Sequence, residues 1–178
     1  FSRRGIPKAL EELESLEEIS ECVVLSTCNR SEIYAACGAP DAAQEALAAF
    51  MSSFHDVPEP ELVPYLYKRT SQDVAHHLFR VVSGLDSLVV GEPQIAGQVK
   101  EAFQIASDRD FTGAALNRLF HCSFGVGKRV RTETGLGEGA VSVSYAAISL
   151  ARKIFGDLGQ LKALVVGAGE MAELTTTH

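Results

Sequence analysis

The sequence predicts an α+β domain, made of a small, mainly antiparallel sheet and a helical subdomain, followed by the first strand and turn of an α/β domain. Two short strand patterns lie close together near the N-terminus, and several amphipathic helix patterns follow them. Near the C-terminus, an apolar strand pattern runs directly into a glycine-rich turn. We therefore expect one domain over residues 1–138, a connecting helix and linker over 139–160, and the start of a second domain over 161–178.

The composition is that of a globular protein and excludes several classes. The 178 residues are 46% hydrophobic and 22% charged, and no apolar run is long enough for a membrane helix or a signal peptide. A net charge of −7 argues against a surface coated with basic charge for nucleic acid, although Lys128–Arg131 is a local basic patch. The chain begins with Phe1 rather than Met, and we expect both ends to be cuts within a longer protein.

The first elements are a surface helix and two strands. Pro7 suits the first turn of a helix, and apolar residues then recur at helical spacing up to Leu16. The apolar run Cys22–Ser26 is typical of a buried strand, and Glu32–Ala36 predicts a second strand. Residues 27–30 then form a tight connection between the two strands, where chemistry is commonly placed.

Helices follow this sheet. The predicted elements are a helix capped by Asp41, a loop over residues 57–64, a helix capped by Ser71, a helix opened by Gly91-Glu92-Pro93, a helix holding Leu116 to Val130, and a helix over about 141–155. The buried stripes are expected at Val74, Leu78 and Val81 in one helix, and at Ile95, Val99 and Phe103 in the next.

A dinucleotide-binding pattern ends the chain. The strand pattern Leu161–Val166 leads into Gly167-x-Gly169-x-x-Ala172, the context that a Rossmann-type fingerprint requires. The first glycine permits a tight turn, the second lets the backbone approach a pyrophosphate, and the third position allows close packing of the helix. A structural glycine-rich turn is the alternative. The cofactor-binding residues would be Gly167, Ala168, Gly169, Glu170, Met171 and Ala172.

The cysteines suggest a reducing compartment and one candidate nucleophile. No C-x-x-C pair is present, so we expect no metal site, and we expect Cys22, Cys37 and Cys122 to be small buried residues. Cys28 differs, because it follows a buried strand and Arg30 lies two residues on. A guanidinium can stabilise a thiolate, which attacks acyl carbons. Arg30 could instead recognise a carboxylate, or be a solvated surface charge.

Two further segments have both a structural and a functional interpretation. His77 lies near the apolar face of its helix, where a histidine is either a satisfied core residue or a group that orients substrate or moves a proton. The polar stretch from Gly84 to Gln94 is either a capped turn between helices or a loop that lines a substrate.

Long motifs in a fixed order resemble the glutamyl-tRNA reductase family. The stretch Val24–Tyr34 is similar to the active-site signature of that family, and Ser83–Lys100, Lys128–Thr134 and Val141–Ser144 also match. The glycine motif falls where the NADPH-binding domain of the family begins. The resemblance covers nearly the whole chain. The opening strand of the family, most of its NADPH domain and its helical dimerisation domain are absent from the chain.

The resemblance implies a mechanism for the intact protein. Cys28 would attack the ester carbonyl of glutamyl-tRNA, and NADPH would reduce the resulting thioester to glutamate-1-semialdehyde, the first dedicated intermediate of five-carbon tetrapyrrole synthesis. Cys28 and His77 would be catalytic. The substrate pocket would be formed by Thr27, Cys28, Asn29, Arg30, Ser87, Glu92, Pro93, Gln94 and Gln98.

The resemblance also implies a cellular location and partners, and two alternative functions stay open. It implies a cytoplasmic enzyme (stromal in a plastid), a homodimer formed through a C-terminal domain, and a complex with glutamate-1-semialdehyde aminomutase. The chain by itself is expected to be inactive, because its cofactor site is incomplete. The rivals are a cysteine-dependent aldehyde dehydrogenase, whose turnover would not need tRNA, and a non-catalytic tRNA- or partner-binding module, which would tolerate loss of Cys28.

Overall fold

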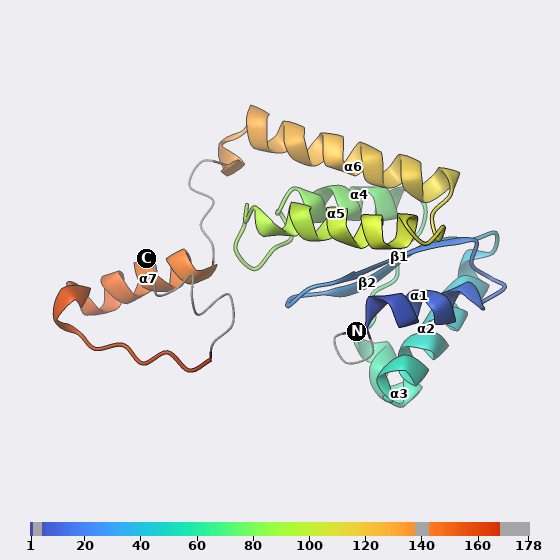
Figure 1. Cartoon of the computed structure of the whole chain (residues 1–178), viewed down its shortest axis with the longest axis horizontal. Helices are drawn as coiled ribbons and strands as arrows, with labels where there is room; N and C mark the ends of the chain where they lie inside the picture. The colour runs from blue at the N-terminus through green and yellow to red at the C-terminus, as the bar shows by residue number, and fades with distance from the viewer. Residues whose placement is uncertain (2–4, 138–142, 168–178) are drawn as a thin grey trace.

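The computed structural model describes Phe1, residues 5–137 and residues 143–167 (Figure 1). Within these residues it contains two strands and seven α-helices. The elements are β1 (Glu21–Ser26), β2 (Ser31–Ala36), α1 (Ile6–Glu14), α2 (Pro40–His55), α3 (Glu59–Leu62), α4 (Gln72–Val82), α5 (Gln94–Ser107), α6 (Ala114–Glu133) and α7 (Val143–Phe155).

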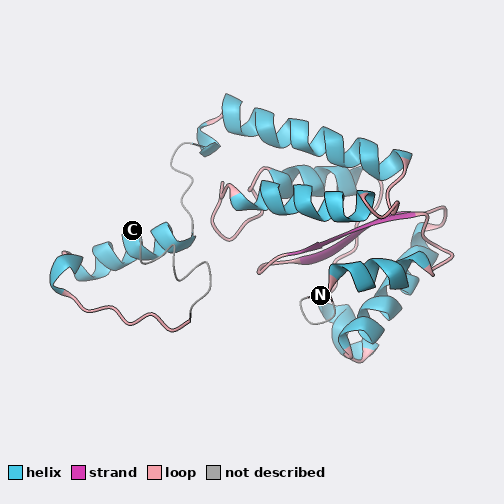
Figure 2. Ribbon diagram, viewed as in Figure 1, coloured by secondary structure: helices cyan, strands magenta, loops and turns pink. Residues whose placement is uncertain are grey.

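The sheet is a single antiparallel pair between two layers of helices. The register places Val23 opposite Tyr34 and Leu25 opposite Glu32. Helices α4, α5 and α6 lie on one side of the sheet, and α1 and α2 lie on the other (Figure 2). The prediction of a small antiparallel sheet with helices is therefore confirmed.

Burial of β1 explains why its sequence is continuously apolar. Residues 22–25 are at most 2% exposed, so both faces of the strand are covered. Leu10 and Leu13 of α1 are fully buried in the same core as Val99 of α5. Burying each such leucine stabilises the fold by roughly 1.5–3 kcal/mol. This core gives the hairpin β1–β2 a rigid base.

A carboxylate on β1 joins the sheet to α6. Glu21 accepts hydrogen bonds from the backbone N–H groups of Ala115 (3.0 Å) and Leu116 (2.7 Å), which lie in the first turn of α6. Partial burial would raise the pKa of Glu21, but these backbone hydrogen bonds outweigh it and lower that pKa. Glu21 therefore serves as a remote cap of the helix N-terminus.

Several local predictions are wrong. Asp41 does not cap α2, because the helix begins at Pro40, Ala39 is its N-cap and no side chain bonds there. Residues 57–64 are not a loop throughout, since prolines suit the first turn of α3 and of a 3-10 segment over Val63–Tyr65. Ser71 occupies the N-cap position of α4 without a side-chain hydrogen bond.

The predicted stripes of α4 and α5 are confirmed. Leu78, Val81, Ile95, Val99 and Phe103 are buried, and Val74 packs against the core. The prediction that three cysteines are buried is only partly right. Cys22 is buried and Cys37 half-buried, but Cys122 is exposed, because its side chain lies on the outer face of α6.

The C-terminal part departs from the prediction. Helix α7 agrees with the predicted helix near 141–155 and lies apart from the layered domain in Figure 1. The predicted strand Leu161–Val166 is not formed: it runs as coil, with Leu164 89% and Val166 91% exposed. A strand needs a hydrogen-bonding neighbour, and no described strand lies beside this segment. No described helix has the length and apolarity required to cross a membrane.

We predict that Gly91→Ala destabilises the chain. Gly91 has φ +86°, and a Cβ there would lie 2.6 Å from the backbone oxygen of Leu136. Left-handed strain and this clash should lower the free energy of unfolding by about 1–3 kcal/mol, as measured by urea denaturation.

Gly97→Ala is the matched control for this change. Gly97 is exposed in the interior of α5, with open space around the position of a Cβ. The substitution Gly97→Ala should raise the free energy of unfolding by up to about 1 kcal/mol, because alanine favours a helix interior more than glycine does. Equal stability of the two variants would contradict the structural role of Gly91.

Candidate active site

The turn between β1 and β2 presents Cys28 at its tip. The backbone N–H of Thr27 donates to the carbonyl of Arg30 at 2.8 Å. The Thr27 hydroxyl accepts hydrogen bonds from the backbone N–H groups of Asn29 and Arg30, both at 3.2 Å. The Thr27 side chain thus replaces a backbone acceptor in the turn. Cys28 and Asn29 are left exposed at a tip whose base is fixed.

The cysteines differ in their access to solvent. Cys28 and Cys122 are exposed, whereas burial and the nearby charge of Glu14 raise the pKa of the Cys22 thiol to about 11. A buried thiol of this kind is inert, and a reactive one must be accessible. Of the two exposed thiols, Cys28 is the one in the turn between β1 and β2, two residues before Arg30.

Arg30 turns inward from the turn and binds two carboxylates. Its Nη1 lies 2.9 Å from Oε1 of Glu32 and 3.2 Å from Oδ2 of Asp86, and its Nη2 donates to the backbone carbonyl of Asp86. The Arg30 side chain is 8% exposed, so it is not a solvated surface charge. Burial would lower the pKa of Arg30, but the charges and hydrogen bonds of Glu32 and Asp86 raise it.

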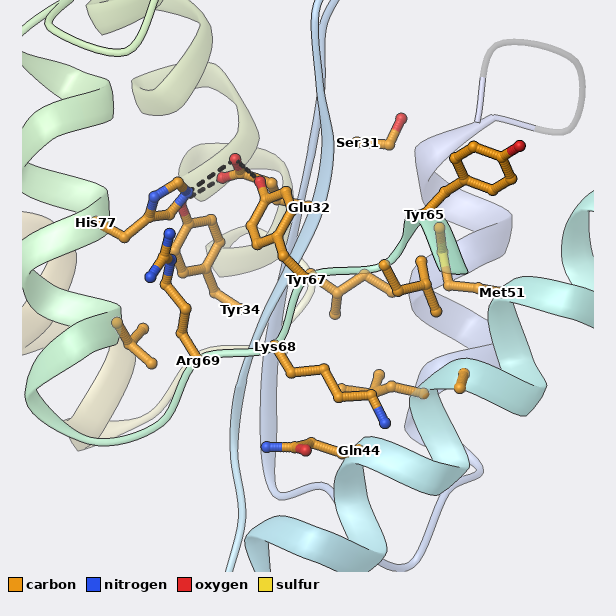
Figure 3. A pocket seen from close by; sticks show the side chains of 15 residues that line it. Ser31, Glu32, Tyr34, Gln44, Met51, Tyr65, Tyr67, Lys68, Arg69 and His77 are labelled. Atoms are coloured by element: carbon orange, nitrogen blue, oxygen red, sulfur yellow. Dashed lines mark hydrogen bonds and ion pairs between the residues drawn. The ribbon is translucent and has the colours of Figure 1, made fainter. Parts of the chain in front are cut away.

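Glu32 is the centre of this polar cluster and was not predicted as a site residue. Its Oε1 accepts from Arg30, from Tyr67 Oη and, at 2.9 Å, from His77 Nε2, and its Oε2 accepts from Tyr34 Oη at 2.5 Å. Figure 3 shows Tyr34, Tyr67 and His77 turned toward this carboxylate. The available signal was an acidic residue at an inward-facing position of β2, since Glu32 shares a face with Tyr34.

Hydrogen bonds keep Glu32 ionised despite its burial. Burial would raise its pKa, but the bonds from His77, Tyr34 and Tyr67 outweigh that effect and lower the pKa from 4.5 to about 2. The same cluster raises the pKa of both tyrosines, because burial and the Glu32 charge oppose a phenolate. At neutral pH Glu32 is therefore ionised, and Tyr34 and Tyr67 are neutral.

His77 has a partner in the core. It is 9% exposed, its Nε2 bonds Glu32, and its ring lies edge-on to that of Tyr67 with centroids 5.5 Å apart. The prediction of a satisfied core histidine is correct in geometry. Its partner Glu32 also binds Arg30. The hydrogen bond that satisfies His77 in the core therefore also connects it to a predicted substrate-binding residue.

The loop between α4 and α5 is closed at its base by two glycines. The N–H of Gly91 donates to the carbonyl of Gly84 at 2.9 Å, and a Cβ on Gly84 would lie 3.1 Å from the Gly91 Cα. Arg131 Nη2 donates to the carbonyls of Glu92 and Pro93, both at 3.2 Å. Part of the predicted basic patch therefore points inward and holds this loop.

The predicted substrate residues of this loop lie in two groups. Ser87 follows Asp86, whose contacts with Arg30 bring it to the Cys28 turn, and the Ser87 hydroxyl is buried without a hydrogen-bond partner among the described residues. Such a hydroxyl is normally satisfied, so a ligand could supply its partner. Pro93 is the N-cap of α5, and Gln94 and Gln98, four residues apart, share a face of that helix.

A cavity of about 190 Å³ lies beside this cluster rather than at Cys28. Its walls come from β2, from α2, from the segment before α4 and from α4, and Glu32, Tyr67 and His77 lie together on one side of it (Figure 3). Cys28, Ser87 and Gln98 are not among its lining residues. The cavity therefore includes Glu32 in its wall but does not include the exposed thiol of Cys28.

Only the first residue of the predicted cofactor site is described. Gly167 has φ +122°, a backbone conformation that favours glycine, and no tight turn is assigned at this residue. Residues Ala168, Gly169, Glu170, Met171 and Ala172 lie outside the described residues. Within the described residues, no group of His, Cys, Asp and Glu is arranged to hold a metal ion.

We predict that acid unfolds the chain partly through Glu32. A lowered pKa means that Glu32 stabilises the fold fully above about pH 4.5 and that this stabilisation is lost as pH falls to about 2. The loss should reach about 3 kcal/mol, as measured by urea unfolding between pH 5 and pH 2. Glu32→Gln should flatten this pH dependence, whereas exposed Glu17→Gln should leave it unchanged; equal slopes for both variants would exclude Glu32 as the source.

Comparisons with known proteins agree on one family. The family model described as "Glutamyl-tRNAGlu reductase, N-terminal domain" matches residues 1–134. The glutamyl-tRNA reductases of Desulfatibacillum aliphaticivorans and Syntrophotalea carbinolica are each 50% identical to this chain, over 95% and 100% of it. These matches cover 39% and 40% of the two relatives.

A solved structure agrees with the sequence relatives. The glutamyl-tRNA reductase from Methanopyrus kandleri superposes with a TM-score of 0.69 at 36% identity, covering 98% of this chain and 40% of that one. The chain thus spans about 40% of the length of the relatives it matches. With a family model over three quarters of its residues and relatives at half identity over its whole length, the chain belongs to the glutamyl-tRNA reductase family.

Proposed function

We propose that a protein containing this chain reduces glutamyl-tRNA to glutamate-1-semialdehyde with NADPH and releases the tRNA. This reaction is the first step of the five-carbon route to tetrapyrroles. The observation that carries the proposal is an exposed Cys28 on a fixed turn, next to an Arg30 held in a buried polar cluster. Family membership supports the same activity.

Cys28 is proposed to act as the nucleophile. Its thiolate attacks the carbonyl carbon of the glutamyl ester, the bond from that carbon to the ribose oxygen breaks, and the tRNA hydroxyl takes up a proton. The product is a glutamyl thioester on Cys28. The exposed tip of the turn suits this step, because a substrate as large as tRNA must reach the sulfur from outside the protein.

Arg30 is proposed to bind a carboxylate of the glutamyl group. A guanidinium has five N–H donors, and the three bonds to Glu32 and Asp86 leave some of them for a ligand. Ser87, whose buried hydroxyl has no described partner, would bind the same group. Asn29 at the tip and Glu92, Pro93, Gln94 and Gln98 would line the remaining surface. Thr27 would act mainly by holding the turn.

His77 is proposed to orient the substrate or move a proton near Cys28. NADPH, held by Gly167 and the residues up to Ala172, would supply the hydride that converts the thioester to an aldehyde and restores the thiol. Residues 161–178 would then be the start of a Rossmann-type domain, in which neighbouring strands would allow Leu161–Val166 to pair. We further propose a cytoplasmic homodimer that forms a complex with glutamate-1-semialdehyde aminomutase.

We predict that Cys28→Ser abolishes thioester formation. The full-length protein, incubated with glutamyl-tRNA labelled on glutamate and without NADPH, should acquire a covalent label that thiols release. Ser is nearly isosteric but far less nucleophilic, so the label should be lost while the melting temperature is unchanged.

Cys122→Ser is the matched control, because Cys122 is the other exposed thiol and lies on α6. That variant should label as the unsubstituted protein does. Label retained in Cys28→Ser would exclude the thioester route. Turnover of a free metabolite without tRNA would instead support an aldehyde dehydrogenase.

We predict that Arg30→Lys weakens use of the substrate. A lysine ammonium cannot form the planar fork that binds a carboxylate with two parallel bonds, so kcat/KM for glutamyl-tRNA should fall roughly tenfold or more, mainly through KM. Arg129→Lys is the control, since Arg129 is exposed and pairs with Glu133 on the same helix. Unchanged kinetics in Arg30→Lys would mean that Arg30 does not bind the substrate carboxylate.

A further inference from the structure

Glu32 connects two side chains that come from separate parts of the chain. Arg30 belongs to the turn that carries Cys28, and His77 lies on α4, 45 residues after Glu32. Both donate to the same carboxylate oxygen, Oε1, at 2.9 Å. The relative position of the guanidinium and the imidazole is therefore set by one atom of a third residue.

Two tyrosines fix the orientation of that carboxylate. Tyr34 donates to Oε2 at 2.5 Å, and Tyr67 donates to Oε1. The side chain of Glu32 is 5% exposed, so protein donors rather than water satisfy it. With donors on both oxygens, the carboxylate cannot rotate without breaking hydrogen bonds in a buried site, where an unpaired charge is very unfavourable.

The same carboxylate determines which nitrogen of His77 carries a proton. An ionised carboxylate can only accept, so Nε2 of His77 must be the donor in this contact. Nδ1 is then the ring nitrogen left to contact a substrate or exchange a proton. Glu32 thus fixes the position of the imidazole and also the atom that it offers to a ligand.

Stability alone does not explain this arrangement. A buried ion pair often adds little to stability compared with an apolar replacement of similar volume. Glu21, on the neighbouring strand, shows what a structural carboxylate looks like here, since it accepts from backbone N–H groups of α6. Glu32 instead accepts from four side chains, of which Arg30 and His77 are assigned to the substrate in the proposed function.

We propose that Glu32 is a positioning residue that makes Arg30 and His77 act as one unit on the substrate. This assignment rests on the proposed function, because it takes Arg30 and His77 to contact the glutamyl group. Glu32 itself touches neither substrate nor sulfur in this role. Its loss should therefore lower kcat/KM strongly only while Arg30 and His77 are both present.

The test is a mutant cycle in the full-length protein with glutamyl-tRNA and NADPH. Glu32→Gln keeps the shape of the side chain and removes the charge, and we expect kcat/KM to fall roughly a hundredfold, as for truncation of a group held in a coupled network. In the background Arg30→Lys/His77→Asn, the same change should lower kcat/KM by less than about threefold. Glu21→Gln is the matched control and should leave kcat/KM near that of the unsubstituted protein.

The outcomes separate the possible failures. An equal loss from Glu32→Gln in both backgrounds would mean a structural role and overturn the inference. If Glu32→Gln does not fold, Tyr67→Phe removes one of the four donors to Glu32 and should lower kcat/KM several-fold in the unsubstituted background only; the same loss in both backgrounds would again overturn it. Retained turnover in Cys28→Ser would overturn the proposed function itself, independently of this cycle.

Discussion

The hydrogen bonds to Glu32 are the constraint on which the arrangement of the site depends. Their donors come from the turn after β1, from β2, from the segment before α4 and from α4 itself. A buried carboxylate is tolerated only when its donors are all in place. One ionised group therefore holds the hairpin, α4 and the segment between α3 and α4 in a common arrangement. Arg30, which bonds this group, lies in the same turn as Cys28.

Much of the architecture could be predicted from local patterns, for physical reasons. Buried stripes at helical spacing identified α4 and α5, and the continuous apolar run of β1 reflected burial on both faces. Glu32 and Asp86 could not be identified in this way. His77, which bonds Glu32, lies 45 residues away from it in the sequence, and Arg30 lies 56 residues away from Asp86. Only the fold brings these pairs together. A charged residue in a strand is otherwise typical of a solvated face.

The segment Leu161–Val166 is a case in which a local sequence pattern predicted an element that the structure does not form. Its composition favours a strand, but a strand is stabilised by neighbours across its edges, whereas a helix such as α7 satisfies its own backbone groups. The segment therefore has the composition of a strand but runs as coil, because no described strand pairs with it. Local composition indicates which element a segment is able to form, but a strand forms only when another strand is available to pair with it.

The glycine contact at the base of the loop between α4 and α5 has a consequence for the surface of the loop. Gly84 and Gly91 touch, Arg131 holds the residues that follow, and Leu88 and Val90 remain 76% and 58% exposed. The closure of the loop is thus separate from the identity of its outermost side chains. Replacing Leu88 or Val90 should therefore change the surface that the loop offers to other molecules without disturbing the fold beneath.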